Sequence, residues 1–212
     1  MLRRLSAFKG SPPNPLDTSS ISFTAKYTGA VWVDHGLSPD YFASRQFRLL
    51  AKGLDLFDSA THRVVGWSFY EWLLQRHCLI DRLIEEKCKV WGEVQVLELA
   101  CGLSPRGYRF CTEAPEGLSR YVEADLPGMV DLKRELLGKA KLDSRLHVLT
   151  EVNILETDTV HSLETVLQAQ FDPSKPLIVV TEVLRPILIR RSWKCFGGAW
   201  LLRLSASRMR VI

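Results

Sequence analysis

The sequence lacks the features that mark disulfide-rich, metal-binding and membrane-spanning proteins. Its five cysteines form no C-x-x-C pair and have no histidine at a ligand-like spacing, which disfavours a disulfide framework and predicts no metal site. No apolar run approaches the roughly 18 residues that cross a membrane. The basic start MLRRLS lacks the apolar stretch and cleavage pattern of a signal peptide. These absences predict a cytoplasmic protein with reduced thiols and no membrane partner.

Acidic residues are missing from one end of the chain. From Arg185 onward there are seven Lys/Arg and no acidic residue. The rest of the chain has 21 basic and 24 acidic residues and therefore a net charge of −3. The overall charge of +4 therefore comes from this tail and does not indicate a nucleic-acid partner. A hydrophobic content of 46% in 212 residues is enough for one sizeable core, so we expect one domain, or one with a cap.

The most informative stretch is residues 94–107, VQVLELACGLSPRG, where an apolar segment ends in a turn of small residues. This is typical of the first parallel strand of a Rossmann-like sheet, whose turn passes close to a cofactor. The acid Glu98 would repel a phosphate and favours a cationic or hydroxyl-rich ligand, such as S-adenosylmethionine (SAM). Ala100 and Ser104 replace the first and third glycines of G-x-G-x-x-G, so the turn alone is equally compatible with any α/β protein.

The next segments repeat the alternation of strand and helix. Residues 120–125 predict a second strand that ends at Asp125, about 20 residues after the turn, where a carboxylate would accept hydrogen bonds from a nucleoside ribose. Residues 146–150 and 176–182 predict two further strands, the last apolar enough to be buried on both faces. The alternation predicts an α/β fold with a parallel sheet and right-handed crossovers.

Four of these segments together resemble one known family. In order and spacing, VLELACGLSPRGYRF, YVEADLPGMVDLKRELL, VNILE and PLIVVTE are similar to the leucine carboxyl methyltransferase family, whose bacterial branch includes O-methyltransferases of polyketide-type pathways. The resemblance covers roughly residues 23–182. It implies a Rossmann-like class I methyltransferase sheet, dependent on SAM, with an added N-terminal helical cap.

The resemblance also implies a set of cofactor contacts. Glu98, Ala100 and Gly102 match the family's motif around the methionine part of SAM, Asp125 its ribose-binding acid, Asn153 and Ile154 a pair against adenine, and Arg76 an arginine that pairs with the SAM carboxylate. The family more often has aspartate where this chain has Asn153, although asparagine can also accept from the adenine amine. From the residues alone, Arg76 would be a solvated helix arginine. No catalytic residue is named, since a carboxylate acceptor needs no base.

The sequence is expected to divide into a flexible leader (1–20), a helical cap (21–90), a SAM-binding Rossmann-like domain (91–184) and a non-native tail (185–212). After Glu182 the chain departs from the family pattern. Residues 183–190 can be back-translated into codons that, after insertion of one base behind the Glu182 codon, encode Gly-Leu-Ala-Thr-Tyr-Phe-Asp-Thr. That sequence resembles the family's continuation. We therefore expect a frameshift, missing C-terminal strands and an unpaired edge on strand 176–182. The alternative is a basic tail that touches membranes or acidic partners.

Three functions remain open from the sequence. The first is methyl transfer from SAM to a carboxylate or hydroxyl of a small-molecule acceptor. The second is a truncated, non-catalytic remnant without SAM turnover. The third is an NAD-dependent Rossmann enzyme, against which Glu98 and the absent G-x-G-x-x-G pattern both count. The sequence leaves the oligomeric state open.

Overall fold

The computed structural model describes residues 19–49, 51–53, 68–138, 140, 142, 145–157, 159–182 and 209–211. Their helices are α1 (Ser19–Asp34), the 3-10 turn η1 (Asp40–Phe42), α3 (Phe69–Trp91), α4 (Arg106–Glu113), α5 (Pro127–Leu137) and α6 (Leu163–Gln170), with further helical residues at 45–49 and 51–53. The strands are β1 (Val94–Leu99), β2 (Leu118–Asp125), β3 (His147–Glu151), β4 (Leu177–Thr181) and β5 (Met209–Val211). This is the expected α/β fold.

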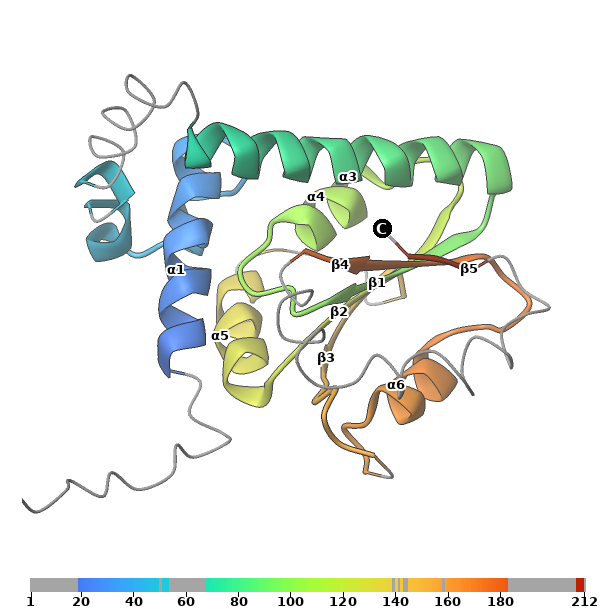
Figure 1. The fold of residues 1–212 in the computed structure, drawn as a ribbon. Coiled ribbons are helices and arrows are strands. Elements are labelled where there is room, and N and C mark those ends of the chain that lie inside the picture. Colours follow the sequence, from blue (N-terminus) through green and yellow to red (C-terminus); the bar gives the residue numbers. More distant parts are fainter. Residues whose placement is uncertain are drawn as a thin grey trace, which may run out of the picture.

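The strands form one parallel sheet in the order β3-β2-β1-β4-β5 (Figure 1). β1 lies at its centre, and Leu97 pairs with Val122 on one side and Val179 on the other. The chain builds outward from β1 to β3 and then returns to place β4 on the other side of β1. The order therefore reverses between β1 and β4, and the crevice at such a reversal is where open α/β sheets bind their ligands.

Alternate residues of the strands enter two separate cores, since neighbouring side chains on a strand point to opposite faces. Val94 and Val96 pack with Ile80 and Ile84 of α3 on one face. Leu97 and Leu99 pack with Val166 and Leu167 of α6 on the other. All six residues of β1 are buried, as expected for a central strand covered by helices on both faces.

Helix α3 forms because a capping residue precedes a long amphipathic segment. The Ser68 side chain accepts a hydrogen bond from the Glu71 N–H at 3.2 Å, and Gly92 ends the helix at a φ of +61°. The apolar face of the helix includes Leu73, Ile80 and Ile84, which are buried. α3 packs on the sheet and runs to Trp91, across the boundary expected at residue 90. No helix in the described ranges is long and apolar enough to cross a membrane.

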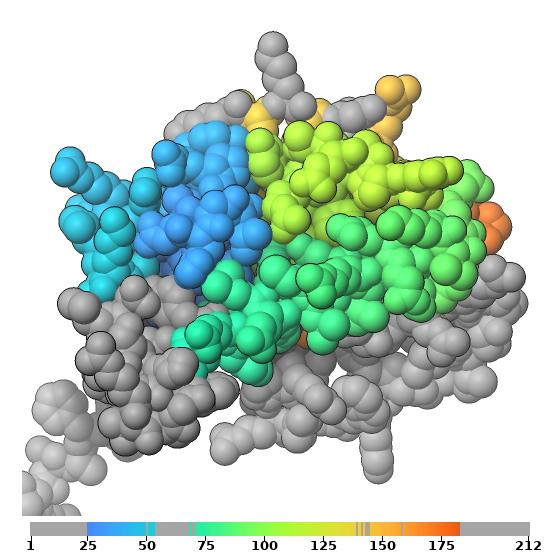
Figure 2. Space-filling model, turned by 90° about the horizontal axis from the view of Figure 1, so that it is seen from above, coloured from blue at the N-terminus to red at the C-terminus, as the bar shows by residue number. Residues whose placement is uncertain are grey.

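Helix α1 packs over the turn that follows β1. Figure 2 shows it beside α3 and beside the yellow-green part of the chain that contains α4 and α5. Ala25 of α1 packs with Leu103 of the turn and Met129 of α5. A Cβ at Gly29 would lie 3.0 Å from the Leu103 Cβ, so the helix and the turn are in close contact. The segment expected to be a helical cap thus shapes the turn directly.

The edge of β4 differs from the expectation. β5 pairs with it in parallel, with Ile178 opposite Arg210, so the expected unpaired edge is wrong for this part of the strand. Residues 209–211 also carry a strand, although the whole tail 185–212 was expected to be non-native. The rest of that tail and residues 1–18 of the expected leader lie outside the described residues, while Ser19 and Ser20 already belong to α1.

Candidate active site

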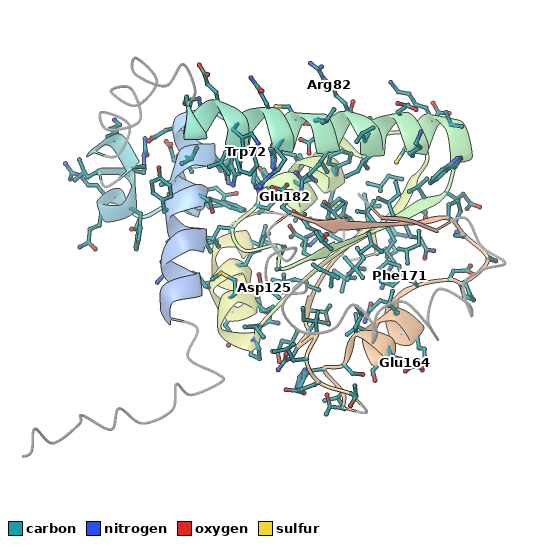
Figure 3. The ribbon with its side chains drawn as sticks, in the orientation of Figure 1. Trp72, Arg82, Asp125, Glu164, Phe171 and Glu182 are labelled. Carbon is teal, nitrogen blue, oxygen red and sulfur yellow. The ribbon has the colours of Figure 1, made fainter. Side chains whose placement is uncertain are left out.

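The sequence-predicted cofactor residues gather at one edge of the sheet. Ala100 and Gly102 follow β1, Asp125 ends β2, and Asn153 and Ile154 follow β3. Figure 3 shows Asp125 and Glu182 at this edge, where Glu182 follows β4. They meet because the carboxyl ends of parallel strands all lie on the same side of a sheet.

The turn after β1 is held in place by the end of β2. Ala100 and Gly102 both have left-handed φ angles, +52° and +51°, which glycine adopts without strain and alanine does not. The Gly102 N–H donates to the Asp125 carboxylate at 2.7 Å. The Lys133 ammonium donates to the Ser104 carbonyl at 2.8 Å and fixes the far end of the turn. The turn is therefore preorganised rather than free to adapt.

The Asp125 carboxylate can still accept hydrogen bonds from a ligand, although each of its oxygens already accepts one from a backbone N–H. Its second oxygen accepts from the Leu126 N–H at 2.7 Å. An ionised carboxylate offers about four acceptor sites, and the two backbone donors use two of them. Burial raises the pKa of Asp125, and the Gly102 and Leu126 N–H groups oppose that rise. Two acceptor positions remain for hydroxyl groups, which suits the predicted ribose role.

Asn153 is engaged in its own loop. Its side-chain oxygen accepts from the Leu155 N–H at 3.1 Å, and its amide nitrogen donates to Glu156 at 2.8 Å. Ile154 is half-buried and packs on the core cluster that includes Leu97 and Leu99. The assignment of Asn153 and Ile154 to adenine stays a prediction.

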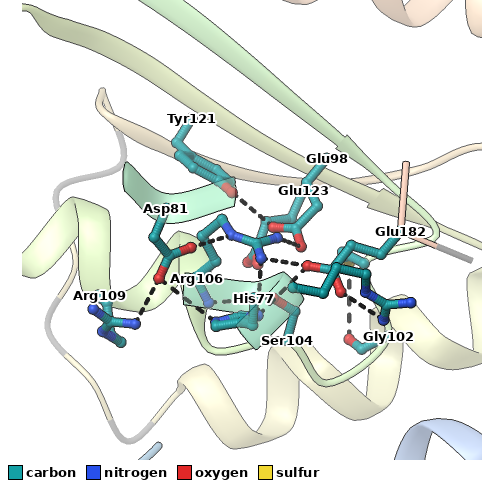
Figure 4. Close-up of polar contacts among 12 residues, drawn as sticks. His77, Asp81, Glu98, Gly102, Ser104, Arg106, Arg109, Tyr121, Glu123 and Glu182 are labelled. Carbon is teal, nitrogen blue, oxygen red and sulfur yellow. Dashed lines mark hydrogen bonds and ion pairs between the residues drawn. The ribbon is translucent and has the colours of Figure 1, made fainter. Parts of the chain in front are cut away.

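A buried arginine that the sequence did not single out lies at the centre of the site. Arg106, the first residue of α4, is fully buried and binds three carboxylates (Figure 4). Its Nε donates to Asp81 at 2.5 Å, its Nη1 donates to Glu98 at 2.7 Å, and its Nη2 donates to Glu182. We call these four residues the Arg106 cluster. It joins α3, β1, α4 and the end of β4.

The second carboxylate oxygen of each acid in the Arg106 cluster accepts a hydrogen bond from another side chain. Asp81 accepts from Arg109 at 2.8 Å, Glu98 from the Tyr121 hydroxyl at 2.7 Å, and Glu182 from Arg76 at 2.9 Å. His77 also contacts the cluster: its Nδ1 lies 2.8 Å from Arg106 Nη2, and its ring stacks on Trp32. Because an arginine has no acceptor, His77 Nδ1 must accept here. His77 is fully buried and is thus a packed histidine of α3.

Glu98 serves the Arg106 cluster in this structure. It is 2% exposed and both of its oxygens are bonded to protein groups. Burial raises the pKa of Glu98, and the attraction of Arg106 opposes that rise. Its role as a contact to the methionine part of the cofactor stays a prediction. The sequence identified Glu98, but it did not indicate that Arg106 is its partner, because a single arginine after a turn carries no distinctive signal.

A second buried charge cluster lies behind the turn. Glu123 accepts from the Lys133 ammonium at 2.6 Å and interacts with His147 Nε2 at 2.8 Å. Burial acts to raise the pKa of Glu123, but Lys133 and the hydrogen bond with His147 outweigh it and hold that pKa at about 2. Because Lys133 also donates to the Ser104 carbonyl, the ion pair between Lys133 and Glu123 helps to hold the turn in place.

The depressed pKa of Glu123 predicts an acid-dependent loss of stability. A carboxylate with a lowered folded-state pKa stabilises the fold above its unfolded pKa near 4.5, and this contribution disappears as the pH falls toward about 2. We expect the gap in unfolding free energy between the wild type and Glu123→Gln to shrink over this window in urea titrations. Glu156→Gln is the control, because Glu156 is solvent-accessible and screening keeps its contribution small. A gap that stays constant from pH 6 to pH 2 would contradict the assignment.

Arg76 is only partly satisfied. Its guanidinium lies 4.6 Å from the Trp72 ring centroid and Nη2 binds Glu182, but the buried Nε has no hydrogen-bond partner within the part of the chain that the structure describes. A buried donor without an acceptor is uncommon and costs free energy. The arginine therefore fits a ligand that carries an anionic oxygen, as the predicted carboxylate contact requires.

Three site residues were missed from the sequence: Asp81, Arg106 and Glu182. Glu182 could have been found, since it follows an apolar strand just as Asp125 ends one. Asp81 and Arg106 carry no comparable signal, because their pairing crosses 25 positions and depends on how α3 packs on α4.

Comparison with known proteins agrees with this arrangement. The family model of leucine carboxyl methyltransferase matches residues 38–192, which is well over half of the chain. No curated protein shows a significant match. The matched region contains the predicted cofactor residues, from Arg76 to Ile154, and the whole Arg106 cluster. The chain therefore belongs to the leucine carboxyl methyltransferase family, a family of SAM-dependent methyltransferases.

Proposed function

We propose that this chain binds SAM at the carboxyl edge of β1, β2 and β4 and transfers its methyl group to a carboxylate or hydroxyl oxygen of a small molecule. The observation that carries the proposal is the 2.7 Å bond between the Gly102 N–H and Asp125, which holds a small-residue turn next to an acid with free acceptor positions. Membership of a SAM-dependent family supports the cofactor and counts against the NAD-dependent alternative.

The residues divide the task of holding SAM. Asp125 would accept from the ribose hydroxyls, Arg76 would pair with the cofactor carboxylate, and the turn at Gly102 would let the backbone approach. SAM supplies a methyl group made electrophilic by its sulfonium. An ionised carboxylate acceptor is already nucleophilic, so the chain has to orient the acceptor in line and exclude water rather than provide a base.

The small-molecule acceptor is the finer part of the proposal. The motifs are similar to the bacterial branch of the family, whose members act in polyketide-type pathways, and this similarity favours a small molecule over a protein C-terminus. An ionised carboxylate acceptor has no proton to lose, whereas a hydroxyl acceptor would also have to give up its proton during the transfer.

The test of this function combines binding with turnover. We expect calorimetry of the full chain to show binding of SAM and S-adenosylhomocysteine (SAH) but not of NAD. Transfer of a labelled methyl group from SAM to a panel of carboxylic acids and phenols should give extractable methylated products. Binding without transfer would support the non-catalytic remnant, and binding of NAD alone would overturn the proposal.

Replacing Asp125 by alanine is expected to weaken SAH binding at least tenfold, about 1.4 kcal/mol. The change removes the proposed ribose acceptor and leaves the Gly102 N–H without its partner. Asp131→Ala is the matched control, because Asp131 is exposed on α5 and pairs only with Arg134 among the contacts described. Calorimetric titration of both variants gives the comparison. An Asp125→Ala protein with wild-type affinity would move the ribose role to another residue.

A further inference from the structure

A short helical segment on the outer side of α1 carries a group of positive charges. Ser44 precedes this segment, which comprises residues 45–49 and 51–53, and its hydroxyl accepts from the Phe47 N–H at 3.4 Å. Figure 1 shows the segment on the side of α1 that faces away from the sheet, and Figure 2 shows it at the surface. Asp125 and the cofactor edge lie on the opposite side of α1 (Figure 3). A ligand bound by this segment would therefore be separate from the cofactor.

Four side chains of the segment share one face. Arg45, Arg48, Leu49 and Lys52 recur three and four positions apart, a spacing that places side chains next to one another on a helix. Together with Ala43 they line a hollow of about 460 Å³, which is within the size range of small-molecule sites. We call it the basic hollow. Among the described residues that line it, three are cations and none is an acid.

The three cations differ in how they are paired. Arg48 is held by Asp34, 3.5 Å from its Nε, and by Asp40, 3.2 Å from its Nη1, so its Nη2 remains for a ligand. Arg45 and Lys52 are exposed and have no acidic partner among the residues that the structure describes. Like charges four positions apart, such as Arg48 and Lys52, destabilise a helix. An anion between these side chains would remove that repulsion.

We propose that the basic hollow binds the phosphate group of a soluble small molecule. A phosphate monoester carries a charge of about −1.5 to −2 at pH 7, which matches the two unpaired cations Arg45 and Lys52. A guanidinium presents parallel N–H donors to phosphate oxygens, and an ammonium adds a point charge. Arg48 is already oriented by its two acids, and Ala43 and Leu49 supply apolar surface beside the charged group. The remainder of the ligand can contact that surface.

The probe for this site is phenyl phosphate, titrated calorimetrically into the full chain at low ionic strength. We expect binding that weakens as sodium chloride is added, because the cations are exposed and screened by salt. Arg45→Met and Lys52→Met should each weaken it about fivefold, near the upper end for an exposed charge pair, and the double variant at least tenfold. Both side chains are exposed, so thermal denaturation should show folded variants with wild-type stability or slightly more.

Two further variants locate the site. Arg82→Met removes an equal charge from the outer face of α3 (Figure 3), and Arg76→Met removes the partly satisfied arginine of the cofactor edge. Neither should change the affinity for phenyl phosphate. An equal loss in Arg82→Met would show general charge attraction, and a loss confined to Arg76→Met would place the anion at the cofactor edge; either result would overturn the inference.

The wild type decides the remaining alternatives. No binding of phenyl phosphate at millimolar concentration would overturn the inference, and so would binding only to phosphatidylcholine vesicles that contain phosphatidic acid, since the surface would then serve a membrane. SAH affinity should be unchanged in Arg45→Met and Lys52→Met. The proposed methyl transfer and the basic hollow can therefore fail independently of each other.

Discussion

Arg106→Met is expected to lower the free energy of unfolding by about 3–5 kcal/mol, the range found when one partner of a buried ion pair is removed. The change leaves Asp81, Glu98 and Glu182 buried with no shared cation, and methionine fills the space without offering a donor. Arg106→Lys should recover little, because a single ammonium cannot reach three carboxylates in the directions that a guanidinium fork does. Urea denaturation followed by circular dichroism measures the difference.

Arg109→Met is the matched control for this experiment. Arg109 lies on the same helix and binds the same Asp81, at 2.8 Å, but its side chain is 25% exposed. Water can replace its hydrogen bonds, so we expect a loss of at most about 1 kcal/mol. Equal losses for the two variants would show that the Arg106 cluster is not a special source of stability.

Gly107→Ala is expected to destabilise the fold by about 3 kcal/mol or more. A Cβ at this position would lie 2.3 Å from the Glu123 carboxyl carbon, closer than real contacts allow. Glu123 cannot yield, because it is fully buried and held by Lys133 and His147. The clash therefore combines overpacking, typically 1–3 kcal/mol, with disruption of a buried ion pair.

Gly128→Ala provides the control. Gly128 is also the second residue of a helix, but a Cβ there meets nothing within 4 Å. Alanine should then stabilise the helix by about 0.5–1 kcal/mol, since it reduces the conformational freedom of the unfolded chain. Thermal denaturation of the two variants should move in opposite directions. A Gly107→Ala protein as stable as the wild type would mean that α4 and Glu123 are farther apart than the structure places them.

The site could be predicted in part because sequence-local signals coincide with a rule of topology. Asp125 is an acid at a strand end, and Gly102 lies in a turn of small residues, and parallel strands bring such positions to one edge whatever the side chains do elsewhere. The Arg106 cluster could not be predicted, because its contacts join residues 25, 8 and 76 positions apart. Only the packing of α3 and α4 on the sheet decides which acids meet which arginine.

The sequence by itself determined the alternation of strands and helices, the family and the acids at the strand ends, since periodicity and strand-end chemistry are local properties of the chain. The tertiary structure decided that Glu98 is bound to Arg106 and Tyr121, that Arg76 is held by Glu182 across 106 positions, and that β5 pairs with β4. Burial and hydrogen-bond partners are set by the sum of many long-range contacts. The sequence alone does not distinguish a charged side chain that is solvated from one that lies at the centre of a buried cluster.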